Sequence, residues 1–192
     1  MKLGEKEIRT KVIERLSTYT NCKIEEEYTT PSGKARADVL AINGHINAYE
    51  IKSDYDSLIR LPSQIREYDE SFERNHIVTS NKYIEKCYSI LPSHWGIILV
   101  EKNRLDNLHL RFIKKATLNP NIEFINIVQH LSSSDLKKYI NENNLNLKLL
   151  LSKKEVRNTF KFPLIRLCND HLSKKEKQLF IVRVRETLKK GL

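Results

Sequence analysis

A chain of 192 residues with 40% hydrophobic and 30% charged residues is long enough for one ordinary domain, or for a domain with a small appendage, and this composition excludes wholesale disorder. No apolar run reaches the roughly 18–20 residues that span a bilayer. The N-terminus lacks the apolar segment of a secretory signal, so we expect a cytoplasmic protein without a membrane partner. Three scattered cysteines exclude a disulfide framework and a cysteine-pair metal site.

The net charge of +10 is unevenly distributed along the chain. Residues 1–100 hold 14 Lys and Arg against 15 Asp and Glu, whereas residues 101–192 hold the other 20 against 9. This asymmetry predicts an anionic partner for the second half, and nucleic acid is the commonest such partner. A basic solubilising surface is the alternative.

The first predicted elements are a helix and a set of strands. Ile8, Val12 and Leu16 have helical spacing and predict a helix over residues 5–18. A short strand is expected over residues 23–29. Asn43-Gly44 is a strong hairpin signal between strands over residues 35–42 and 47–52.

The next elements alternate between helix and strand. Pro62 suits the first turn of a helix over residues 62–73, which Ile65, Tyr68 and Phe72 make apolar on one face. The remaining elements of this part are a strand over 76–80, a helix with its N-cap at Asn81 that runs to about Leu91, and strands over 96–101 and 108–113.

After about residue 118 the pattern becomes helical and basic. Ser132 to Asp135 and Ser173 to Glu176 resemble N-terminal capping boxes, the second of a helix that runs toward Lys190. The segment 180–184 within that helix has the composition of a strand. We therefore predict an α/β core over residues 1–117 and a basic, mainly helical subdomain over residues 118–192.

Carboxylates and a lysine follow one another on two of the predicted strands. Asp38 lies on the first, and Glu50-Ile51-Lys52 lies on the second. Two carboxylates suit a hard cation such as Mg²⁺, which can polarise a phosphoryl oxygen and generate a nucleophilic hydroxide. This pattern predicts metal-assisted hydrolysis of phosphodiesters.

The hairpin between the two strands restricts the geometry of this site. A two-residue loop would pair Ile42 with His45 and turn Glu50 away from Asp38, because strand side chains alternate between faces. A three-residue loop with Gly44 in a left-handed conformation brings Asp38, Glu50 and Lys52 onto one face. We therefore predict the odd register.

Each predicted site residue has a chemical role. Asp38 and Glu50 would bind the cation, with the backbone carbonyl of Ile51 as a further ligand. Lys52, held protonated by the two carboxylates, would orient water or stabilise developing phosphorane charge. Gln64 and Tyr68 are i, i+4 neighbours that would hydrogen-bond water, Lys52 or a phosphate. Each fragment alone also has an ordinary structural explanation, and the combination argues for a site.

The motifs Ala35-Arg-Ala-Asp38, Glu50-Ile-Lys-Ser-Asp54 and Gln64-x-x-x-Tyr68 resemble those of the PD-(D/E)XK nuclease superfamily, in particular a small bacterial branch. The resemblance covers roughly residues 5–80, with Ala37 where the superfamily name has proline. It implies a restriction-endonuclease-like core (αβββαβ, a mixed central sheet flanked by helices), dependence on Mg²⁺ or Mn²⁺, and cleavage of DNA or, less often, RNA.

The same resemblance implies an additional glutamate on the first helix. Glu7 is the predicted metal ligand, with Glu5 and Glu14 as rivals, and Glu27 is another acidic neighbour. Arg36 shares a strand face with Asp38, where it would either hold a phosphate or pair with a carboxylate.

Basic residues near the C-terminus are the predicted contacts to nucleic acid, which we expect to be DNA. They are Lys153, Lys154, Arg157, Lys174, Lys175 and Lys177. Three functions remain open: an active deoxyribonuclease, a non-catalytic nucleic-acid-binding protein, and a subunit of a repair or defence assembly that needs a protein partner. A homodimer is a further possibility, since it would ease cleavage of both strands.

Overall fold

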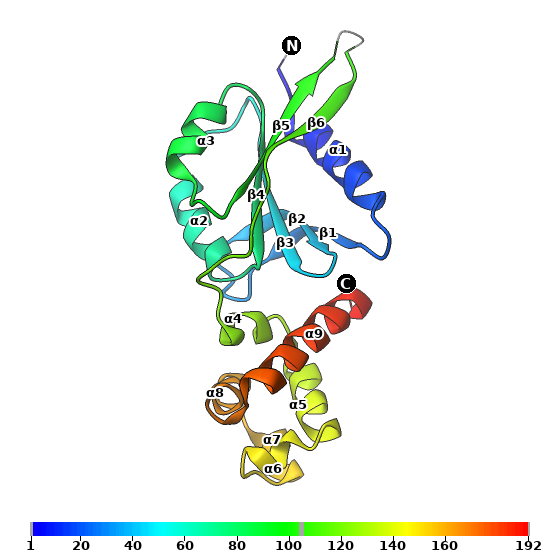
Figure 1. The fold of residues 1–192 in the computed structure, drawn as a ribbon, viewed down its shortest axis with the longest axis vertical. Coiled ribbons are helices and arrows are strands. Elements are labelled where there is room, and N and C mark those ends of the chain that lie inside the picture. Colours follow the sequence, from blue (N-terminus) through cyan, green and yellow to red (C-terminus); the bar gives the residue numbers. More distant parts are fainter. Residues whose placement is uncertain (1, 104–105, 192) are drawn as a thin grey trace. The chain divides into compact units, whose positions relative to one another are not determined.

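The computed structural model describes residues 2–103 and 106–191 (Figure 1). These residues form two compact units that divide between Ile122 and Glu123. The boundary expected from the sequence lay five residues earlier, between 117 and 118.

The first unit is an α/β structure with a six-stranded mixed sheet. The strands lie in sequence order, with antiparallel pairs β1–β2, β2–β3 and β5–β6 and parallel pairs β3–β4 and β4–β5. The elements are α1 (Glu5–Ser17), β1 (Lys23–Thr29), β2 (Arg36–Ile42), β3 (Ile46–Lys52), α2 (Leu61–Asp69), β4 (Arg74–Thr79), α3 (Ile84–Ile90), β5 (Gly96–Lys102) and β6 (Leu108–Lys114).

Helices cover both faces of this sheet (Figure 1). On one face, α1 buries Ile8, Val12 and Leu16 against strand side chains that include Val39 and Ile51. The helices α2 and α3 are the crossover connections of the parallel strands β3–β4 and β4–β5, and they lie on the other face. The even-numbered side chains of β2 and β3 therefore point toward α2.

The hairpin between β2 and β3 has the predicted odd register. Ile42 pairs with Ile46, which leaves a three-residue loop at 43–45 with Gly44 at a φ of +74°. The same register sets Asp38 opposite Glu50, one step beyond the last paired residues, Val39 and Tyr49. The prediction of a three-residue loop is confirmed.

Two expected helix boundaries were wrong. The third helix begins at Ile84 rather than after Asn81. The backbone forms a turn there instead, in which the Lys82 N–H donates to the Ser80 hydroxyl and the Tyr83 N–H donates to the Ser80 carbonyl. The helix α2 ends at Asp69, short of the predicted residue 73, yet Phe72 is still fully buried.

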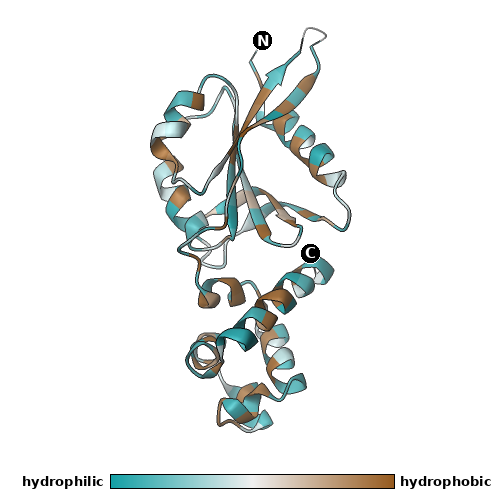
Figure 2. Cartoon of the chain, in the orientation of Figure 1, coloured by the Kyte–Doolittle hydropathy of each residue, from teal (hydrophilic) through white to brown (hydrophobic). Residues whose placement is uncertain are grey.

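The second unit is helical and basic. Ser132 caps its second helix, and the last helix runs unbroken through the strand-like segment 180–184. Its apolar residues Phe180, Val184 and Leu188 recur every fourth position and are buried, so helical packing prevailed over strand propensity (Figure 2). The helices are α4 (Phe124–Val128), α5 (Ser133–Glu142), α6 (Leu145–Lys148), α7 (Lys153–Asn158), α8 (Lys161–His171) and α9 (Lys174–Gly191).

The charge asymmetry follows the division into units. Residues 123–191 hold 15 Lys and Arg against 7 Asp and Glu. None of the helices among residues 2–103 and 106–191 combines the length and apolar composition that crossing a bilayer requires.

Replacing Gly44 tests the constraint on the hairpin. Gly44→Val should lower the free energy of unfolding by about 1–2 kcal/mol, because a β-branched residue is strained at positive φ. Gly44→Asn should cost much less, since Asn tolerates the left-handed region. Urea denaturation measures both. Equal stability of the two variants would show that the loop does not depend on this conformation.

Candidate active site

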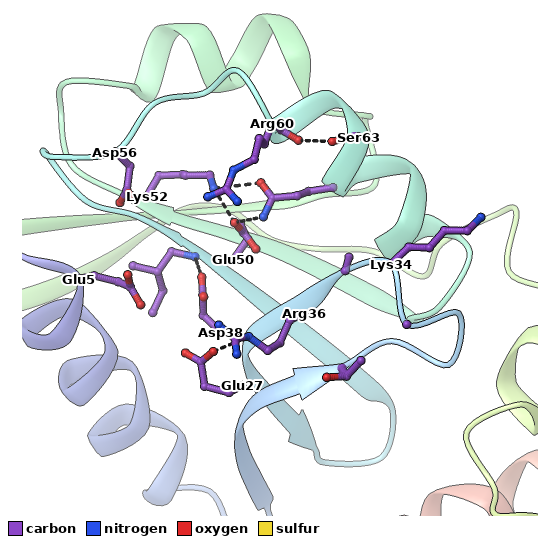
Figure 3. A pocket seen from close by; sticks show the side chains of 15 residues that line it. Glu5, Glu27, Lys34, Arg36, Asp38, Glu50, Lys52, Asp56, Arg60 and Ser63 are labelled. Carbon is purple, nitrogen blue, oxygen red and sulfur yellow. Dashed lines mark hydrogen bonds and ion pairs between the residues drawn. The ribbon is translucent and has the colours of Figure 1, made fainter.

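The predicted motifs surround one cavity of about 500 Å³ in the first unit (Figure 3). Its lining comes from α1, β1, β2, β3, the start of α2 and the loops before β2 and before α2. The lining residues that carry charge or a side-chain amide are Glu5, Glu27, Lys34, Arg36, Asp38, Glu50, Lys52, Asp56, Arg60 and Gln64.

Glu50 is the most heavily bonded group of the cavity. Only 2% of this residue is exposed. Its Oε1 accepts hydrogen bonds from Lys52 Nζ at 2.5 Å and from Gln64 Nε2 at 2.6 Å, while Oε2 accepts one from the Tyr68 hydroxyl. Lys52 also donates to Gln64 Oε1 at 3.0 Å. The structure thus joins four predicted site residues in one network, and Tyr68 also packs against Phe72, as its place in the apolar stripe predicted.

Asp38 is held by the backbone of the neighbouring strand. Its Oδ2 accepts the Ile51 N–H at 2.6 Å, and its Oδ1 lies 3.8 Å from the Arg9 guanidinium. Burial and the negative charge of Glu50 raise the pKa of Asp38 to about 7, against the lowering effect of the Ile51 hydrogen bond. Two carboxylates that repel each other in this way are stabilised by a cation placed between them.

The donor set fits a hard divalent cation. Among the described residues, Asp38 Oδ1 has no partner closer than Arg9 at 3.8 Å and Glu50 Oε2 accepts one hydrogen bond, from Tyr68, so each carboxylate retains lone-pair capacity. Ile51 lines the cavity too, and its carbonyl points to the same strand edge as its N–H, beyond the last β2–β3 pair. Two carboxylates, one carbonyl and water match the preference of Mg²⁺ or Mn²⁺ for oxygen ligands.

A second group of carboxylates shares Asp38. Oxygen atoms of Glu5, Glu27 and Asp38 lie within 4.8 Å of one another. The Arg9 guanidinium binds Glu5 and Glu27 directly, so an organic cation already neutralises this group. Sequence reasoning missed Arg9, because its partners Glu27 and Asp38 are distant in the sequence and no motif contains it.

Glu27 reaches this group through an unusual backbone conformation. Its φ is +56°, inside a strand, and it stands opposite Asp38 between the paired residues Glu26 and Tyr28. A non-glycine residue at positive φ costs about 1 kcal/mol or more, and such strain is concentrated at functional sites. The sequence signal for Glu27 was only the acidic run 25–27.

The structure does not bring Glu7, the predicted glutamate of the first helix, to the cavity. Its carboxylate turns back to accept the Gly4 N–H at 3.0 Å at the start of α1, and the residue does not line the cavity. Its rival Glu5 does line it. At the third helical position a glutamate side chain readily satisfies the free N–H before the helix, which removes it from the site.

Arg36 has the carboxylate partner that was one of its two predicted alternatives. Its Nε lies 2.6 Å from Glu27, and the side chain is 64% exposed at the cavity. The six predicted cations of the second unit belong to α7 and α9, and none of them is a lining residue of this cavity. None of the six forms an ion pair with a carboxylate among the described residues, although Lys177 donates to Asn169.

The raised pKa of Asp38 predicts a pH-dependent stability. The folded state binds this proton more tightly than the unfolded state, whose pKa is near 3.8, so the free energy of unfolding should fall as pH rises from about 4 to 7. Asp38→Asn cannot ionise, and at pH 8 without metal it should be more stable than wild type by on the order of 1 kcal/mol or more. Urea denaturation in EDTA at several pH values measures this, with exposed Asp106→Asn as the control. An Asp38→Asn variant less stable than wild type at pH 8 would contradict the electrostatic strain.

Comparison with known proteins identifies the family of this chain. Protein cII of Enterobacteria phage P4 is 29% identical over 143 residues, which are 73% of this chain and 54% of that protein, so the chain spans about half the length of this relative. The SPO1766 protein of unknown function from Silicibacter pomeroyi is similar over 60% of this chain and 74% of its own, at 18% identity and a TM-score of 0.44. The model of the bacteriophage P4 protein cII family matches residues 1–188, and this chain belongs to that family.

Proposed function

We propose that this protein is a metal-dependent nuclease of the PD-(D/E)XK type that hydrolyses phosphodiester bonds in DNA. The observation that carries the proposal is the arrangement of Asp38, Glu50, Lys52 and Gln64 around one cavity in the first unit. The order of elements from α1 to β4, on a mixed sheet covered on both faces, supports a restriction-endonuclease-like core.

Asp38 and Glu50 would hold the cation, with the carbonyl of Ile51 beside them. A bound Mg²⁺ or Mn²⁺ supplies Lewis acidity toward a phosphoryl oxygen and lowers the pKa of a coordinated water. The high pKa of Asp38 means that cation and proton compete for the same carboxylate. Binding of the cation is therefore expected to release a proton near pH 7.

Lys52 would act on the phosphate. The ammonium group has three N–H donors, of which two point to Glu50 and Gln64, so one is left for a phosphate oxygen or a water in the cavity. A fixed positive charge at that position stabilises charge that develops in the transition state. Gln64 and Tyr68 hold Glu50 in place from α2 and thus position the carboxylate.

The basic second unit supplies an expected source of affinity for DNA. Its excess of eight positive charges is suited to phosphate contacts that ignore base sequence, and it includes the six predicted cations of α7 and α9. This part of the proposal concerns affinity and not chemistry, because all lining residues of the cavity come from the first unit.

Incubation with circular, linear and single-stranded DNA tests the nuclease proposal. We expect wild type to cut with Mg²⁺ or Mn²⁺ and not with EDTA, and we expect Glu50→Gln and Lys52→Met to lose at least about a hundredfold in rate. Glu70→Gln and Lys86→Met, which are exposed and outside the cavity, should retain activity.

The variant Asp38→Asn distinguishes loss of catalysis from misfolding, because it is expected to be inactive yet more stable than wild type at pH 8. Cleavage that survives in Glu50→Gln, or that does not depend on metal, would refute the proposed mechanism. A wild type that binds metal but cuts none of the DNA forms would leave a non-catalytic or partner-dependent role.

Arg9 should weaken the binding of the cation. Its guanidinium lies 3.8 Å from Asp38 Oδ1, so Arg9→Gln should raise the affinity for Mn²⁺ by about tenfold at low salt, because a like charge is removed. Arg15→Gln on the same helix, whose side chain contacts Thr18 instead, is the matched control. Titration of free Mn²⁺ by electron paramagnetic resonance measures both. If Arg9→Gln loses affinity instead, Arg9 organises the acids rather than competing with the metal.

A further inference from the structure

The loop between β3 and α2, residues 53–60, borders the cavity and exposes apolar side chains. We call it the rim loop. Within it Asp56 and Arg60 line the cavity, whereas Tyr55 is 70% exposed and Ile59 is 87% exposed. From this arrangement we propose that the rim loop binds unpaired nucleotides of the substrate. Arg60 would bind a backbone phosphate, and Tyr55 and Ile59 would pack against the bases. The inference rests on the nuclease proposal and adds the substrate class.

Hydrogen bonds hold the first part of the rim loop, residues 53–56, next to the exposed side chain of Tyr55. Asp56 Oδ2 accepts from the N–H of Ser53 at 2.7 Å and from its hydroxyl at 2.6 Å. The Tyr83 hydroxyl donates to the Asp56 carbonyl, and Lys82 Nζ donates to the Asp54 carbonyl at 2.5 Å. A preorganised loop pays little ordering entropy on binding.

Arg60 differs from the other cations of the cavity. Arg36 pairs with Glu27 and Lys52 pairs with Glu50, but the Arg60 guanidinium has no carboxylate partner among the described residues. Figure 3 shows Arg60 extending from the start of α2 toward Lys52 and Glu50. An unpaired guanidinium beside a phosphodiester site is suited to a phosphate next to the scissile one, which it can bind with two N–H groups.

Tyr55 and Ile59 favour an unpaired strand over an intact duplex. Aromatic side chains bind single strands because every base offers a face for stacking, whereas bases in a duplex are already stacked on one another. Lys2 Nζ lies over one face of the Tyr55 ring, 5.4 Å from its centre, and adds a positive charge near the ring for the strand backbone. The apolar and cationic side chains together match a polyanion with exposed bases.

Fluorescence anisotropy of the full chain in EDTA tests the rim loop without cleavage. The probes are a labelled single strand of about 20 nucleotides, which exceeds the usual site sizes, and a duplex of the same sequence. Tyr55→Ser, Ile59→Ser and Arg60→Gln should each weaken single-strand binding by about tenfold, and Tyr55→Phe should restore it. Tyr88→Ser and Arg66→Gln are matched controls, since both residues are exposed and outside the cavity.

The salt dependence separates the two kinds of contact. Arg60→Gln should reduce the slope of log Kd against log salt by about 0.7, the value for one phosphate contact to a single strand, whereas Tyr55→Ser should leave the slope unchanged. Unaltered single-strand affinity in the three variants would overturn the proposal. Equal losses of affinity for the duplex and for the single strand would also overturn the proposal.

The remaining outcomes distinguish the rim-loop proposal from a protein interface and from the nuclease proposal. If Tyr55→Ser and Ile59→Ser change the sedimentation of the protein alone, the apolar side chains form a protein interface and the proposal fails. If the three variants weaken binding as expected but wild type never cuts with Mg²⁺, the rim loop stands and the nuclease proposal fails. If wild type cuts and the variants bind and cut normally, only the rim loop is refuted.

Discussion

The pairing of β2 with β3 is the constraint on which the candidate site depends. Because Ile42 pairs with Ile46, Asp38 stands opposite Glu50 and the two side chains leave their strands on the same face, where Gln64 and Tyr68 of α2 donate to Glu50. A slip of one residue would turn every side chain of one strand to the opposite face. It would also bury the wrong set against α1, whose contacts include Val39, so packing and chemistry fix the same register.

The same face carries charges that a purely structural core would avoid. Glu50 and Lys52 are almost fully buried, and a buried ion pair is often no more stable than apolar residues of the same volume. Lys52, Gln64 and Tyr68 all donate to Glu50, yet Asp38 has a raised pKa and Glu27 has a positive φ. Such local conflicts, held in place by a well-packed sheet, are typical of functional sites.

Sequence reasoning predicted that the motif residues come together and missed contacts that no motif contains, such as that between Arg9 and Glu27. Apolar spacing and turn residues predicted the elements, and the requirement that Asp38 and Glu50 share a strand face predicted the hairpin register. The position of a glutamate around the first helix could not be predicted, because capping at Gly4 withdrew Glu7 from the site.

The second unit shows the same division. The tetrapeptide Ser-Lys-Lys-Glu occurs twice, and it forms a capping box at Ser152 as well as bonds between Ser173 and Glu176, but only the second copy was predicted as a helix start. Local signals of this kind are correct where packing agrees with them, as it does along α9, and they say nothing about which unit a helix joins.

The central claim is that Asp38 and Glu50 together hold one cation. A crystal grown with Mn²⁺ at pH 8 tests it through anomalous scattering. The account predicts one strong peak at about 2.0–2.2 Å from oxygens of both carboxylates. A peak between Glu5 and Glu27 alone, or none at saturating Mn²⁺, would contradict it.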